Sequence, residues 1–281
     1  PRSTLDRSSA ASDVYKRQEL RTLMEQVRQG KSEDFLLKSN DILLRSRSSK
    51  EKDPEVEALT RMQRALFGIG DDESTGSELK WCMERLNAIS AGSINHGVSI
   101  LNLAAWHRNK GETMMALAMH SSISPSTGHP IQILGLSRLE VGRMLASLDD
   151  LSTAMRHLWA ARGYLNDSGM APESLTASLE WLDIALEEVS DIAPRMQHRV
   201  ENAKPRSEPG TTWIPANPKD VREVVEMLLP VLLEDASGMD RADLGLLIDA
   251  AEMLEEDGWI TSIEDKVGEI QDPRLLDLLQ S

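Results

Sequence analysis

Histidine is the residue of this chain with the widest chemical use, since neutral imidazole binds metals and exchanges protons near neutral pH. A histidine-based metal site needs further ligands at a suitable spacing, such as the two histidines of an HExxH helix. No histidine here pairs with another histidine or a cysteine in this way, and HExxH is absent; the six are His96, His107, His120, His129, His157 and His198. The sequence therefore predicts histidines that pack and hydrogen-bond, and no metal site.

Patterns for nucleophilic or acid–base catalysis are also missing. Cys82 is the only cysteine, and it lies on the apolar side of an expected helix, where cysteine is usually a packing residue. Acidic runs such as residues 255–257 are typical of solvated helix faces, whereas a catalytic pair requires burial. GxSxG, P-loop and GxGxxG sequences are absent, and the GIG sequence at 68–70 is interpreted as a turn. We therefore expect no enzyme activity and no cofactor.

The composition favours an all-α fold. Of the 281 residues, 40% are hydrophobic but only 4% are aromatic. Leu, Ala and Met dominate the apolar runs and are good helix formers, whereas strands favour β-branched and aromatic residues. Apolar residues recur at helical spacing from residue 19 onward, and strand-like alternation is nearly absent. Helices must therefore position any functional side chain.

Charge narrows the choice of partner. The net charge is −15, and it becomes −17 without residues 1–18, which carry a net charge of +2. A chain this acidic is repelled by phosphate backbones and by anionic membranes, so nucleic-acid and membrane binding are disfavoured. The longest apolar run, at 227–233, is too short to cross a bilayer. We expect a cytoplasmic protein with a protein or peptide partner.

Four segments follow from the distribution of apolar and polar residues. Residues 1–18 contain SSAASDVYKRQ, which resembles a translated sequencing adaptor, and we interpret them as a non-native or disordered tail. Residues 19–203 are expected to form a helical-repeat domain. Residues 204–217 are rich in proline and polar residues and are predicted to be a linker. Residues 218–281 are expected to form a small C-terminal helical module.

Apolar spacing and the residues at the joints predict the helix boundaries. In the middle third we expect helices at about 94–109, 112–124, 130–147, 150–166, 172–189 and 192–203. Earlier in the chain, residues 68–76 should form a turn, with Ser77 capping the next helix. Pro230 should kink or break the helix that begins at Pro218. The next helix should stop at Gly258, and two short helices at about 261–270 and 273–280 complete the chain.

Two consecutive segments share one order of small and large residues, with equivalent positions 38 residues apart. Each has a small and a larger residue in its first helix, a turn residue, and a small and a larger residue in its second helix. The first segment uses Ala104, His107, Gly111, Ala116 and His120, and the second uses Gly142, Leu145, Asp149, Ala154 and Leu158. Small residues let two helices approach closely, and the turn residue accommodates the tight connection.

This order resembles that of the tetratricopeptide repeat family, most clearly over residues 95–166. The resemblance implies an α-solenoid of stacked antiparallel helix hairpins, with the first helix of each pair lining a concave groove. The chain departs from the family in two ways. His and Leu replace its usual aromatics, and its repeat of about 34 residues is shorter than the steps of 40, 41 and 38 residues between turn centres here.

A solenoid of this kind predicts a scaffold or adaptor that binds a peptide or protein segment in its groove. On the groove face of the two matched segments we expect Arg108, Asn109, Arg143 and Ser147. The two arginines are suited to receive a carboxylate through paired hydrogen bonds. The alternative is a ligand-sensing regulatory helical protein with a closed cavity and no catalysis of its own.

Overall fold

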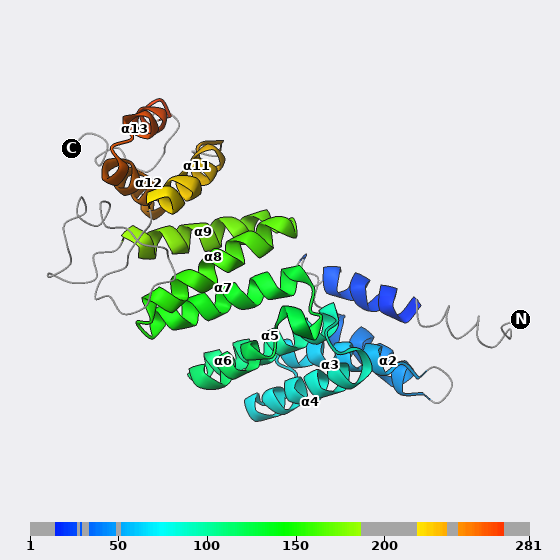
Figure 1. The fold of residues 1–281 in the computed structure, drawn as a ribbon. Coiled ribbons are helices and arrows are strands. Elements are labelled where there is room, and N and C mark those ends of the chain that lie inside the picture. The colour runs from blue at the N-terminus through cyan, green and yellow to red at the C-terminus, as the bar shows by residue number, and fades with distance from the viewer. Residues whose placement is uncertain are drawn as a thin grey trace, which may run out of the picture. The chain divides into compact units, whose positions relative to one another are not determined.

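The computed structural model describes residues 15–26, 29, 34–48, 52–186, 218–234 and 241–266. Within these ranges the protein is all-α, and the regular elements are helices (Figure 1). A first helix covers residues 15–26. It is followed by α2 (Phe35–Arg47), α3 (Pro54–Leu66), α4 (Asp72–Ser90), α5 (Ile94–Asn109), α6 (Thr113–Ser121), the 3₁₀ turn η1 (Pro125–Thr127), α7 (Ile131–Ser147), α8 (Leu151–Asp167), α9 (Ala171–Leu186), α11 (Pro218–Glu234), α12 (Arg241–Leu254) and α13 (Asp257–Glu264).

The helices of the middle third begin and end close to the predicted positions, because local signals set their ends. Ser93 caps α5 by accepting a hydrogen bond from the His96 backbone N–H at 3.2 Å, and Asp150 caps α8 in the same way. The predicted helix at 192–203, the linker at 204–217 and the helix at 273–280 lie outside the described residues. Residues 15–18, which the sequence places in the tail, form the first turn of the first helix.

Two predicted boundaries are wrong, and of the kink or break predicted at Pro230 the break does not occur. α4 begins at Asp72 rather than after Ser77, because the Asp71 carboxylate accepts a hydrogen bond from the Ser74 backbone N–H at 2.6 Å and caps the helix earlier. α11 runs through Pro230 to Glu234, so this proline does not end the helix. α12 ends at Leu254 rather than Gly258, because Glu255 adopts a left-handed backbone with φ of 55°.

The chain divides into two compact units, Pro1–Ile133 and Leu134–Ser281. In the first unit, helices pack mainly on their neighbours in sequence, from α2 against α3 through to α5 against α6. In the second unit, α8 packs against α9, and α11 and α12 pack against each other and also against α9. This sequential packing is consistent with stacked helix pairs.

The small residues of the repeat pattern lie where helices approach one another. Ala104, Ala116 and Ala154 are all buried. A Cβ added to Gly142 would lie only 2.7 Å from Cγ of Leu158, so α7 and α8 meet at a position that has no room for a side chain. Gly111 and Asp149 adopt left-handed backbone conformations, with φ of 77° and 63°, at the two turns. The predicted small and turn positions are therefore confirmed.

In the second unit, one apolar core joins the helices on both sides of the expected linker. Trp181 of α9 is fully buried, and the same cluster includes Val221 and Leu228 of α11 and Leu247 of α12. Burying this many large side chains is the main source of helix stability in a protein of this kind. The helices after residue 217 therefore pack on α9 as part of one unit.

Candidate binding groove

Arg108 and Asn109, the first two predicted binding residues, lie in the last turn of α5 and are exposed. They belong to the first compact unit, whereas Arg143 and Ser147 belong to the second. The structure therefore brings Arg108 together with Asn109, and Arg143 together with Ser147 one turn further along α7. Each pair is therefore described within its own unit.

Arg143 is engaged within its own unit. Its Nε and Nη2 donate to Oε1 of Glu180 at 2.9 and 2.6 Å, and its Nη1 donates to Oε1 of Glu140 at 2.8 Å. The hydrogen bond with Glu180 raises the pKa of the Arg143 guanidinium. The Ser147 hydroxyl donates to the Met144 carbonyl at 2.7 Å. A carboxylate from a partner would have to displace Glu180 or Glu140 before it could pair with Arg143.

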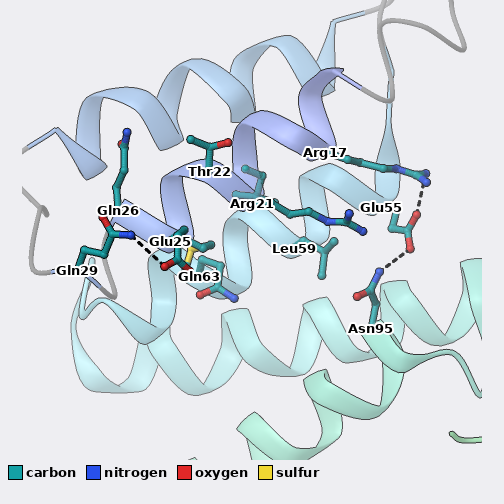
Figure 2. Close-up of a pocket in the computed structure, with 12 residues that line it drawn as sticks. Arg17, Arg21, Thr22, Glu25, Gln26, Gln29, Glu55, Leu59, Gln63 and Asn95 are labelled. Carbon is teal, nitrogen blue, oxygen red and sulfur yellow. Dashed lines mark hydrogen bonds and ion pairs between the residues drawn. The ribbon is translucent and has the colours of Figure 1, made fainter.

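A pocket of about 820 Å³ lies in the first unit, and none of the four predicted residues lines it (Figure 2). Its walls are alternate helices of this unit, namely the first helix, α3 and the start of α5. The lining residues are Arg17, Leu20, Arg21, Thr22, Met24, Glu25, Gln26, Gln29, Glu55, Leu59, Gln63 and Asn95. We call this pocket the groove.

Two rows of side chains at helical spacing form the facing walls of the groove. One row stands on the first helix and the other on α3, and each repeats every four residues, which places side chains on one helix face. The two rows are related by an offset of 38 residues, which pairs Arg17 with Glu55, Arg21 with Leu59, and Glu25 with Gln63. This is the same offset that relates the two repeat segments further along the chain.

Hydrogen bonds within the groove engage both of its carboxylates. Glu55 accepts from Asn95 Nδ2 at 2.8 Å and forms an ion pair with Arg17 Nη2, also at 2.8 Å. At the other end, Glu25 accepts from Gln29 Nε2 at 3.1 Å. Figure 2 shows these contacts towards opposite ends of the pocket, with Arg21 between them.

Arg21 and Gln63 differ from the carboxylates in that their side chains have unused hydrogen-bonding capacity. Neither side chain has a hydrogen-bond or ion-pair partner among the residues that the structure describes. Arg21 is exposed and Gln63 is half-buried, and they stand on opposite walls. The groove therefore offers a cation and an amide to an external ligand.

The position of this groove does not follow from the sequence pattern. An offset of 38 residues relates the α5–α6 segment to the α7–α8 segment, and the same offset, found here between the first helix and α3, is not part of that prediction. Setting residues 1–18 apart also removed Arg17 from consideration. Amides such as Gln63 and Asn95 carry no motif that distinguishes a binding residue from an ordinary surface residue.

Two histidines form the most unusual titratable pair outside the groove. His96 and His129 are both buried, and their rings stack with centroids 5.2 Å apart. Burial lowers the pKa of both imidazoles, so both are neutral at pH 7. Within the described residues no group of three potential metal ligands comes together. The pair therefore packs the first turn of α5 against the loop before α7.

Cys82 lies on the core-facing side of α4 and is fully buried. Burial raises the pKa of its thiol to about 12, so the thiolate is essentially absent at neutral pH. A nucleophilic cysteine requires the opposite shift. Cys82 is accordingly a packing residue.

Comparison with known proteins gives no relative from which a function could be transferred. No protein-family model, no curated protein and no solved structure matches this chain. In the described part of the chain, no helix has the length and apolar character needed to traverse a membrane. The residues of the groove must therefore carry the functional argument.

Proposed function

We propose that this protein is a tetratricopeptide-like helical-repeat scaffold that binds an extended segment of another protein in the groove, with no catalytic step of its own. One observation carries the proposal: the pocket of about 820 Å³ is walled by three alternate helices, the first helix, α3 and the start of α5. The volume lies within the range of roughly 300–1,000 Å³ that is typical of ligand-binding pockets in proteins. A groove on first helices is also the feature that the repeat pattern predicts.

The polar groups of the groove suit a peptide main chain. An Asn or Gln side chain has both a hydrogen-bond donor and an acceptor, as a peptide unit does. One side-chain amide can therefore bind one backbone C=O and one backbone N–H of a bound peptide. Gln63 and Asn95 stand on two different helices, which places amides along the path of a bound chain. The groove floor adds apolar contact through Leu59 and Met24, both half-buried.

The test begins with selection of linear peptides from a random twelve-residue display library on the immobilised full chain. A selected peptide is then titrated by fluorescence anisotropy against the wild-type protein and Gln63→Trp. The indole fills space next to Leu59, so we expect binding at least roughly tenfold weaker, because the ligand loses both its site and an amide partner.

Asn87→Trp is the matched control, since Asn87 is an exposed amide on α4 outside the groove. This variant should bind as the wild type does, and both variants should retain the wild-type melting temperature. Equal binding by Gln63→Trp and the wild type, or failure of the library to yield any binder, would contradict the proposed function.

A further inference from the structure

The groove is lined by two arginines and two glutamates, but these charged side chains are not equally available to a ligand. It contains two carboxylates among its lining residues, but both accept hydrogen bonds from neighbouring groove residues. Arg21, by contrast, has no partner among the residues that the structure describes. A ligand carboxylate can therefore pair with the Arg21 guanidinium, whereas the Glu55 carboxylate is already paired with Arg17 and the Glu25 carboxylate already accepts from Gln29.

The apolar floor strengthens this preference. Leu59 lies at the position of α3 that corresponds to Arg21 on the first helix, and it is half-buried. An aliphatic ligand side chain on Leu59 would exclude water from the neighbouring carboxylate–guanidinium pair, and charge-assisted hydrogen bonds are stronger when water is excluded.

The dimensions of the groove fix the spacing of the two ligand side chains. The rows span eight residues of helix, about 12 Å, which corresponds to about four residues of extended chain. Successive side chains of an extended chain point in opposite directions. A chain lying between the two walls therefore directs one residue towards Arg21 and the very next one towards Leu59.

The overall charge limits how acidic the ligand is. The chain carries a net charge of −15, so a long acidic run would be repelled by the molecule as a whole. A single carboxylate loses little to this repulsion, because distant charges are screened beyond about 8 Å at physiological salt. A segment with one acidic residue and no other charge can therefore pair with Arg21 and is only weakly repelled by the protein's net negative charge.

We propose that the groove recognises an acidic residue directly adjacent to an aliphatic one in an extended segment. The carboxylate pairs with Arg21, the aliphatic side chain packs on Leu59 and Met24, and Gln63 hydrogen-bonds to the main chain. This inference rests on the proposed function but names the ligand.

The display library tests the inference through the sequences it returns. Among peptides whose binding is lost in Gln63→Trp, we expect enrichment of Asp or Glu next to Leu, Ile or Met. Selection on Arg21→Ala should lose the acidic preference and keep the aliphatic one. Arg156→Ala is the matched control, since Arg156 is an exposed arginine on α8, and it should return the wild-type pattern.

Titration of a single selected peptide measures how much the carboxylate–Arg21 pair contributes to the binding affinity. Replacing the acidic residue of a selected peptide by its amide should weaken binding to the wild type by roughly tenfold and to Arg21→Ala by less than about twofold, as expected for loss of one charge-assisted pair. Groove-dependent peptides enriched in Lys or Arg, or an acidic preference that survives Arg21→Ala, would overturn the inference while leaving the groove as a binding site. A library with no groove-dependent peptide would overturn the proposed function instead.

Discussion

Gly142 of α7 faces Leu158 of α8 at a position where even one added carbon has no space. A Cβ there would lie 2.7 Å from Leu158 Cγ and 3.4 Å from the Ala154 carbonyl oxygen. Gly163, on the same α8, has nothing within 4 Å of an added Cβ. Two glycines in neighbouring helices therefore have opposite packing environments, although neither requires a positive φ.

We expect Gly142→Ala to destabilise the protein by about 1–2 kcal/mol, because overpacking outweighs the gain in helix propensity. Gly163→Ala should stabilise it by about 0.5–1 kcal/mol, since only the propensity changes. Urea denaturation followed by circular dichroism measures both. Equal or greater stability of Gly142→Ala relative to the wild type would contradict the close approach of the two helices.

At this scale the sequence predicts packing better than binding. Gly142 and Ala154 could be identified because small residues recur at a fixed offset and serve the same purpose each time. Arg143 could not be assessed in this way, because its partner Glu180 is 37 residues away and no local pattern links the two. Binding residues depend on which polar groups remain unengaged, and that is a property of the folded chain.

Helix α8 contacts α7 through a titratable group as well as through small residues. Nδ1 of His157 lies 3.4 Å from Nη1 of Arg138 on α7. Burial, together with the positive charges of Arg138 and Arg156, lowers the pKa of His157 to about 4, while Asp150 opposes the shift. The ring is therefore neutral in the folded protein at every pH above about 4.

This lowered pKa makes stability depend on pH with a definite sign. Below the unfolded pKa of about 6.5, the unfolded chain binds a proton at His157 that the folded chain does not, so stability falls as the pH drops from about 6.5 towards 4. His157→Gln cannot bind this proton. We expect its loss of stability between pH 8 and pH 5, measured by urea denaturation at each pH, to be smaller than that of the wild type. An equal loss in both proteins would be evidence against a neutral, partly buried His157.

The helix boundaries show which local signals are reliable. α5 was predicted at 94–109 and lies at Ile94–Asn109, because Ser93 is a strong cap and Gly111 a strong stop. α4 was misplaced because Asp71 and Ser77 are both acceptable caps, and the sequence does not show which one pairs with a free N–H three residues later. At Gly258 the prediction relied on glycine as a stop, but Glu255 adopts the left-handed conformation instead.

At the scale of the molecule, the proposed function depends on alternate helices that line one groove. In the first unit, the first helix, α3 and α5 all contribute residues to it (Figure 2). An all-α fold with sequential packing followed from composition and periodicity. The place of the groove did not, because it depends on how far apart the first helices stand, and side-chain patterns along one helix carry no information on that distance.

The most direct measurement places a photoreactive residue with a slender aliphatic diazirine side chain, which does not fill the groove as an indole would, at position 63 or, as a control, at position 87. Each protein is irradiated with a library-selected peptide, and the adducts are mapped by mass spectrometry. The account predicts adducts from position 63 on the central residues of the peptide and none from position 87. Adducts from position 87 alone, or none from position 63 with a peptide that demonstrably binds, would contradict a groove between the first helix and α3.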